Sequence, residues 1–223
     1  MNPNVYSVAG STVDTAAKNK LIRNTYTLLS MTLVFSAITA GISMAMNVGF
    51  GANLLSFVGS MILLMFVLPR TANSSMGLVV VFALTGLMGF GLGPLLNHYL
   101  ALPNGGQVVM TALGGTGAIF LGLSGYALTT RKDFSFMGGF LMAGFMVVLL
   151  AALGNIFFAI PALSLAISAA VVMLMSGFIL FDTSRIVNGG ETNYLMATVG
   201  LYLSIYNLFT ALLHLLGAFS SDD

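Results

Sequence analysis

The sequence predicts an all-α membrane protein, a bundle of seven transmembrane helices, from its composition and from the spacing of its apolar runs. Only 6% of the 223 residues are charged and 58% are hydrophobic, whereas an ordinary soluble domain is roughly 25% charged. A soluble protein of this length needs a charged shell, because a large share of its residues faces water. Lipid must therefore surround most of this chain.

Seven apolar stretches are long enough to cross a bilayer, which takes about 20 residues at ~1.5 Å per residue. Short separators containing Pro, Gly, Asn and Ser divide them. The predicted spans are residues 24–46, 51–68, 76–100, 107–129, 134–157, 162–182 and 194–218. The chain then divides into an N-terminal tail (1–23), a seven-helix domain (24–218) and a short C-terminal tail (219–223).

The basic residues predict the orientation of the bundle. All seven fall in alternate links, which places them on one side of the membrane: Lys18, Lys20 and Arg23 in the tail, then Arg70, Arg131, Lys132 and Arg185. Cytoplasmic loops carry the excess of Lys and Arg in membrane proteins. We therefore expect a cytosolic N-terminus and, with an odd number of spans, a periplasmic C-terminus.

Several classes of function find no support in these residues. A net charge of +1 argues against nucleic acid as a partner, because phosphate binding needs clustered basic residues. No His, Asp and Glu cluster has metal-ligand spacing, and no cofactor motif is present. The string Gly122-Leu-Ser124-Gly resembles the serine motif of rhomboid proteases, but the predicted topology puts Ser124 and His214 near opposite faces. We therefore expect no enzyme activity.

Asp182 is the first candidate for a functional residue, because ionisable groups at membrane depth are costly. It ends the sixth apolar run three residues before Arg185, a spacing that places both on one helical face. An ion pair that anchors the helix end is the simplest interpretation, with Arg70 as a second possible partner. Glu191, in the following link, is most simply a solvated charge.

The seventh span is the most polar and is predicted to lie at the centre of the bundle. It carries Tyr202, Ser204, Tyr206 and Asn207 at mid-membrane depth, where polar side chains face other helices and not lipid. Hydrogen bonding between helices and the lining of a polar path both fit this pattern. Glycine pairs such as Gly89 and Gly93, and the pair Gly139 and Ala143, predict close helix packing within the bundle.

Two segments near the end of the chain resemble the Bax inhibitor-1 family. They are residues 178–187, FILFDTSRIV, and residues 201–209, LYLSIYNLF, followed by Leu212, Leu213 and Gly217. The run from Asp182 to Tyr194, together with residues 204–207, is most similar to the bacterial YccA-like branch. The seven-span layout agrees with this resemblance.

The resemblance implies two functions of different classes. Some family members resemble pH-sensitive leak channels for calcium or other cations, in which two aspartates on the sixth and seventh spans share a proton. Asp182 matches the first aspartate, but Ser204 stands at the second position. A site formed by Asp182, Ser204, Asn207, Arg70 and Arg185 would sense ions or protons under this hypothesis.

The YccA-like branch resembles a modulator of FtsH, the membrane-anchored ATP-dependent protease that extracts and degrades membrane proteins. Under this hypothesis the chain is a substrate-like inhibitor in the bacterial inner membrane. The N-terminal tail, including Lys18, Lys20 and Arg23, would be the cytosolic segment that the protease grips. A pulling protease needs an unstructured handle, and a tightly packed bundle behind it resists extraction.

Overall fold

The computed structural model describes residues 3–220 of the chain, with side chains described from residue 16 onward. Every regular element in this range is helical. In chain order the elements are α1 (Pro3–Ala45), α2 (Phe50–Ile62), the π-helical turn η1 (Leu63–Val67), α3 (Leu68–Thr71), α4 (Met76–Leu100), α5 (Gly105–Thr130), the 3-10 turn η2 (Ser135–Met137), α6 (Gly138–Phe158), α7 (Pro161–Asn188) and α8 (Tyr194–Ser220). Seven stretches of helix are long and apolar enough to cross a membrane, so the predicted fold class is confirmed.

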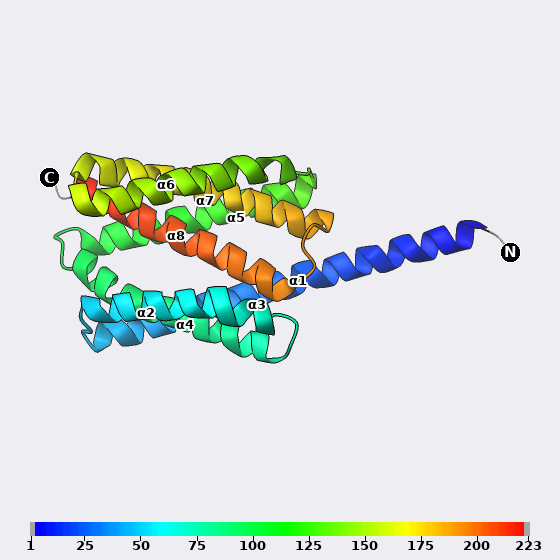
Figure 1. Cartoon of the computed structure of the whole chain (residues 1–223), viewed down its shortest axis with the longest axis horizontal. Coiled ribbons are helices and arrows are strands. Elements are labelled where there is room, and N and C mark those ends of the chain that lie inside the picture. Colours follow the sequence, from blue (N-terminus) through cyan, green and yellow to red (C-terminus); the bar gives the residue numbers. More distant parts are fainter. Residues whose placement is uncertain (1–2, 221–223) are drawn as a thin grey trace.

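The ends of two helices differ from the prediction. Helix α1 begins at Pro3, so the expectation of an unstructured N-terminal tail was wrong for the residues described. In Figure 1 the first part of α1 projects beyond the rest of the bundle. Helix α7 continues past Asp182 to Asn188 and stops at Gly189, whose φ of 84° suits a glycine cap. Of the predicted C-terminal tail, α8 includes residues up to Ser220, and residues 221–223 lie outside the described range.

The second span changes its winding before a proline. Helix α2 passes into the π-helical turn η1 and then into α3, which contains Pro69. Proline has no backbone N–H, and its ring clashes with the carbonyl one turn earlier in an α-helix. A π-helical turn is a known accommodation inside helices. Here it lets a single span continue through Pro69 to Thr71.

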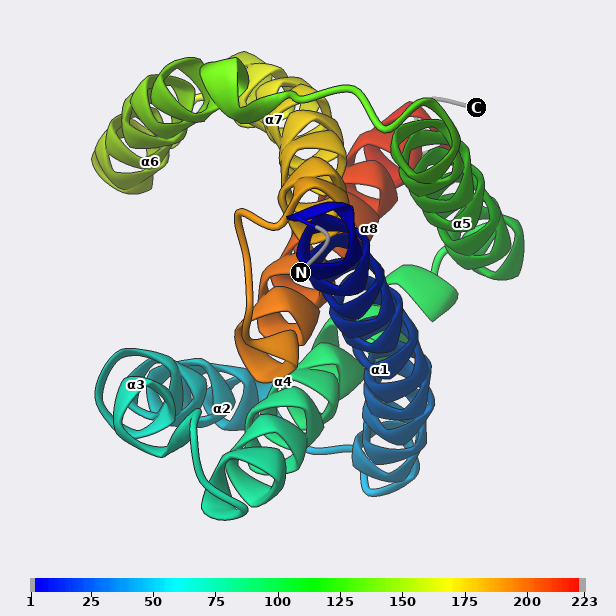
Figure 2. The same ribbon diagram turned by 90° about the vertical axis from the view of Figure 1, so that its right-hand side faces the viewer.

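Helix α8 lies at the centre of the bundle, as predicted. It packs against α1, α4, α5 and α7, and Figure 2 shows these helices around it, with α2 and α6 further out. Its buried face supplies residues to all three apolar clusters of the described chain, among them Tyr202, Leu208 and Leu213. The outer helix α6 buries only Leu141, because its other faces meet lipid.

Small residues set the closest helix contact, between α1 and α4. A Cβ atom at Gly89 would collide with the backbone oxygen of Ser36, and one at Gly93 would collide with the Ser43 side chain. The predicted role of Gly89 and Gly93 in packing is therefore confirmed. The prediction was wrong for Gly139 and Ala143, because both residues are exposed on α6. The α6–α7 contact uses Gly144 and Gly177 instead, against leucines of the facing helix.

One end of the bundle gathers the basic residues, and we call it the basic end. Figure 1 shows the projecting part of α1, the α3–α4 link, the end of α5 and the α7–α8 link at this end. All seven Lys and Arg residues of the chain lie in these segments or close to them in the sequence. The arrangement agrees with the alternating pattern on which the orientation was predicted. That the basic end faces the cytosol stays a prediction.

The glycine contacts predict a selective loss of stability. Gly89→Ala should lower the free energy of unfolding by about 2–3 kcal/mol, because the new methyl group overpacks the α1–α4 contact. The matched control is Gly122→Ala on α5, where a Cβ meets nothing within 4 Å; it should be neutral or stabilise by up to about 1 kcal/mol. Denaturation of the purified proteins in detergent measures both. Equal effects would contradict the assigned contact.

The absence of cysteine from the sequence allows a direct test of orientation. A single cysteine in place of Lys132 should react with a membrane-impermeant maleimide only after the membrane is opened. A cysteine in place of Asn104, in the link at the opposite end, should react in intact cells whose outer membrane has been permeabilised. The reverse pattern would place the basic end in the periplasm.

Candidate functional site

The side chain of Asp182 lies between α7 and α8, near the basic end. Its Oδ2 atom is 3.1 Å from the position that a Cβ would occupy at Gly200, so the absence of a side chain at Gly200 makes room for the carboxylate. Asp182 is half-buried, and within the described residues no hydrogen bond satisfies its carboxylate. A partly buried charge without a partner is costly in a membrane protein and marks a functional candidate.

A small cavity of about 150 Å³ adjoins the Asp182 carboxylate. It is lined by Asp182, Arg185 and Ile186 of α7, Glu191 of the link, and Met196, Ala197 and Gly200 of α8. The volume and the charged lining suit several water molecules. In the part of the chain that the structure describes, no group of three or more His, Asp, Cys or Glu side chains is placed to hold a metal ion.

The expected ion pair between Asp182 and Arg185 is not present. The Arg185 guanidinium lies 3.5 Å from the Glu191 carboxylate, donates to the Gly190 carbonyl at 3.1 Å, and lies 5.6 Å from the centre of the Phe181 ring. Helix α7 continues through residue 185, and the chain then folds back at Gly189, which brings Glu191 to the arginine. The expectation that Glu191 is a solvated charge was therefore wrong.

Arg70, the second predicted basic partner of Asp182, does not pair with the aspartate either. Its guanidinium donates to the backbone carbonyl of Phe66, and among the described residues it forms no ion pair. Asn193, in the link between α7 and α8, instead joins that link to the one between α3 and α4. The Asn193 amide donates to the Ala72 carbonyl and to the Asn73 side chain, both at 2.9 Å, and its oxygen caps the start of α8.

Ser204 and Asn207 of α8 lie farther from the basic end than Asp182 of α7. The Ser204 hydroxyl donates to the Gly200 carbonyl at 3.1 Å, one helical turn toward the basic end. The residue of α8 that meets the aspartate is thus Gly200. Asn207 is exposed on the helix surface and donates to its own helix at the Leu203 carbonyl. The structure therefore groups Asp182 with Gly200, Arg185 and Glu191, and places Ser204 beside this group.

Two hydroxyl networks hold the helices around this site. Tyr202 of α8, which is 1% exposed, donates to the Thr85 carbonyl of α4 at 3.2 Å and bonds Ser36 of α1 at 2.7 Å. Because the tyrosine proton is already used, Ser36 donates to Tyr202. The network joins three helices through one side chain.

The second network centres on Thr183, next to Asp182 in the sequence. Its hydroxyl lies 3.2 Å from both the Tyr26 hydroxyl of α1 and the Ser124 hydroxyl of α5. Ser124 thus bonds a threonine, while His214 bonds Ser168 at 2.8 Å, and these two residues do not pair. Sequence reasoning missed the Thr183 network, although hydroxyl residues near three span ends were a signal for it.

The chain is similar to known membrane proteins over most of its length. Residues 18–221 match the family model described as "Inhibitor of apoptosis-promoting Bax1". The chain belongs to the Bax inhibitor-1 family. Its segment around Asp182 and the polar α8 are the regions that carried the resemblance. The seven-span architecture extends the agreement to the remaining helices.

Three bacterial relatives of the family are similar throughout. An "Uncharacterized membrane protein" of Vibrio cholerae is 51% identical over 223 residues, covering 100% of both chains. The "Modulator of FtsH protease YccA" of Escherichia coli K12 is 52% identical over 204 residues, covering 92% of each chain. An "Inner membrane protein YccA" of Escherichia coli O6:H1 shows the same identity and coverage.

The unpartnered carboxylate predicts an unusual effect of its removal. Asp182→Asn should raise the free energy of unfolding by about 1–3 kcal/mol, because it removes a partly buried charge that lacks a hydrogen bond. Glu191→Gln, which weakens a partly exposed ion pair, should change it by no more than about 1 kcal/mol in the opposite direction. Denaturant titration at neutral pH compares the two variants. A loss of stability in Asp182→Asn would mean that the carboxylate is stabilised by its surroundings.

Proposed function

We propose that this protein binds FtsH in the bacterial inner membrane and restrains proteolysis by it. The observation that carries the proposal is the 52% identity, over 92% of each chain, with a relative named as a modulator of FtsH protease. Identity at this level over nearly the whole length supports a common fold and a related role. The structure adds a physical account of how a seven-helix bundle slows a pulling machine.

The projecting start of α1 supplies the handle. This part of the helix extends past the other helices in Figure 1, and its sequence contains Pro3, Gly10 and several Ser, Thr and Val residues, which are weak helix formers. A short helix without a bundle to pack against is marginally stable. It therefore unwinds at little cost when a protease grips it.

The resistance begins where α1 enters the bundle. Leu21 and Ile22 pack against the largest apolar cluster, and Leu28 and Leu29 are buried within it. Deeper along α1, the Ser36 hydrogen bond to Tyr202 and the close contact with Gly89 connect the helix to α8 and α4. Pulling on the handle must break these contacts together, because α1, α4 and α8 share one core. Slow extraction of this kind occupies the protease.

Deletion of residues 2–15 tests the handle. These residues precede the part of α1 that contacts the bundle, so membrane insertion and thermal stability should stay unchanged. Degradation of the variant by purified FtsH should fall to background, and the variant should no longer slow degradation of a second membrane substrate. A variant in which Gly and Ser replace residues 2–15 at equal length is the control, and it should still be engaged. Full inhibition by the deletion variant would contradict the handle mechanism.

A second candidate function is a leak for calcium or protons, favoured by the cavity beside the unpartnered Asp182 carboxylate. The first proposal predicts that liposomes containing the protein and a calcium dye show no flux at any pH in a series. Flux that Asp182→Asn abolishes would establish the leak and overturn that expectation. Asp133→Asn is the control, because Asp133 lies outside the cavity at the same end of the bundle.

A further inference from the structure

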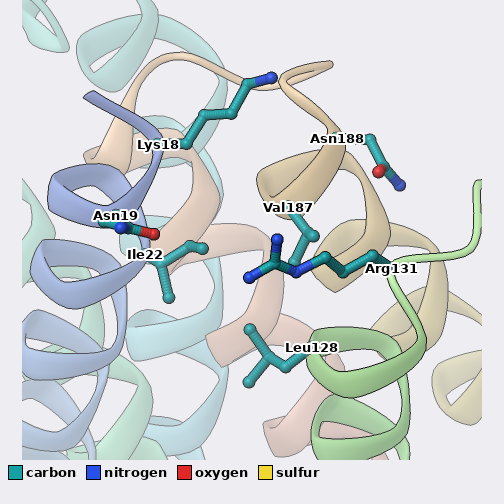
Figure 3. A pocket seen from close by; sticks show the side chains of 7 residues that line it. All are labelled: Lys18, Asn19, Ile22, Leu128, Arg131, Val187 and Asn188. Atoms are coloured by element: carbon teal, nitrogen blue, oxygen red, sulfur yellow. The ribbon is translucent and has the colours of Figure 1, made fainter. Parts of the chain in front are cut away.

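A pocket of about 340 Å³ opens at the basic end, where α1, α5 and α7 come together. Its lining consists of Lys18, Asn19 and Ile22 from α1, Leu128 of α5 with Arg131 just after it, and Val187 and Asn188 from α7. In Figure 3 the Arg131 guanidinium points from the end of α5 into the space between α1 and α7, with Leu128 below it. Two basic side chains from different helices thus line one concave site.

Both charged side chains in the lining of the pocket are basic. No described acidic side chain pairs with Arg131, and no acidic residue is among those that line the pocket. The acid nearest to Arg131 in the sequence, Asp133, accepts the backbone N–H of Ser135 at 2.8 Å. This hydrogen bond lowers the pKa of Asp133 and uses its carboxylate to cap the η2 turn. The Arg131 guanidinium is therefore available to an anion in the pocket.

Part of the wall of the pocket is apolar. Ile22, Leu128 and Val187 form this part. The backbones of α1 and α5 make no close contact along their described length, and a second cavity, of about 440 Å³, lies between the two helices further from the basic end, where Leu33 and Ala37 of α1 and Leu113 and Gly117 of α5 line it. Side chains of the two helices meet at the Tyr26–Phe120 ring pair, with centroids 6.2 Å apart. Phe120 lies about 16 Å along α5 from Arg131. The stretch of α5 between these two residues is therefore about as long as the hydrocarbon depth of one leaflet, ~15 Å.

We propose that this pocket binds the headgroup phosphate of an anionic phospholipid from the adjacent leaflet, with its acyl chains in the opening between α1 and α5. Arginine suits a phosphate because its planar guanidinium donates two parallel hydrogen bonds. Basic pockets between transmembrane helices on the cytoplasmic side recognise acidic headgroups. The orientation of the bundle in the membrane by itself accounts for basic residues at this end. It does not account for two of them lining one cavity whose wall is partly apolar.

The position of the site gives the lipid a structural role. Bound there, it bridges α1 to α5 and α7 at the level where α1 leaves the bundle, and so covers a gap that direct helix contacts do not close. The bridge would oppose separation of α1 from the bundle. This inference concerns lipid binding alone and does not depend on whether the protein engages FtsH.

Native mass spectrometry of the purified full-length protein tests the site. Protein from mixed micelles of phosphatidylglycerol and phosphatidylcholine should retain one phosphatidylglycerol. Arg131→Gln should reduce this preference about fivefold, and the double variant Lys18→Gln with Arg131→Gln about 25-fold, since each basic side chain near an anionic headgroup contributes about fivefold. The matched control is Lys20→Gln with Lys132→Gln, which removes the same charge at the same end from residues outside the pocket lining.

The outcomes separate the sources of the effect. Loss of preference in the pocket variant, with retention in the control, supports the site. Equal loss in both double variants would show general attraction between the basic end and anionic lipid, and would overturn it. Inorganic phosphate that displaces the retained lipid at equal concentration would show a site for the free anion. Thermal unfolding of each variant without lipid excludes misfolding, and a higher melting temperature in phosphatidylglycerol than in phosphatidylcholine, only with the pocket intact, supports the bridging role.

Discussion

The hydrogen bonding of polar groups within lipid is the constraint on which this structure depends. No water in the bilayer core can satisfy a hydroxyl group, so a hydrogen-bond partner within the protein stabilises it there. Helix α8 carries many such groups, and its Tyr202 bonds residues of α1 and α4 together. A helix of this composition is stable only when other helices surround it. The central position of α8 follows from this requirement.

The same requirement is met differently at the basic end. Thr183 bonds hydroxyl groups from α1 and α5, and Ser184 donates to the Lys132 carbonyl in the α5–η2 link at 3.0 Å. Asp182, the neighbour of both, has no such partner among the described residues. Its carboxylate instead faces a polar cavity beside Gly200. Thr183 and Ser184 thus fix the position of α7, while the carboxylate of Asp182 forms no hydrogen bond to another helix in the described part of the chain.

Helix α1 joins two regions of very different stability. Its inner part shares the core with α4 and α8, whereas its first residues project beyond the bundle. The projecting part has no other helix beside it in Figure 1, so it opens at small cost, and the shared core opens only cooperatively. A protease that starts at the weak part reaches the strong part through a continuous helix. The basic pocket lies at the boundary between the weak and the strong part of α1. A lipid bound there would increase the difference in stability between them.

Much of the fold was predictable from the sequence, because the bilayer imposes one length and one solvent on every span. The limits of the third span, Met76–Leu100, agree with the prediction residue for residue, since polar links bound that apolar run on both sides. The start of α1 and the end of α7 could not be predicted from hydropathy. Both helices continue into polar sequence, where caps and neighbouring helices, and not hydropathy, decide where they stop.

The sequence by itself determined the solvent of this protein, the number of its spans and the polar character of the last helix, because composition and apolar length are local properties. It also identified Asp182 as an exceptional charge. Only the tertiary structure decided which residues meet. Arg185 pairs with Glu191 because the chain reverses at Gly189, and Gly200 faces Asp182 because of how α7 and α8 pack. The pocket lined by Lys18 and Arg131 joins residues more than a hundred positions apart, so no local sequence pattern predicts it.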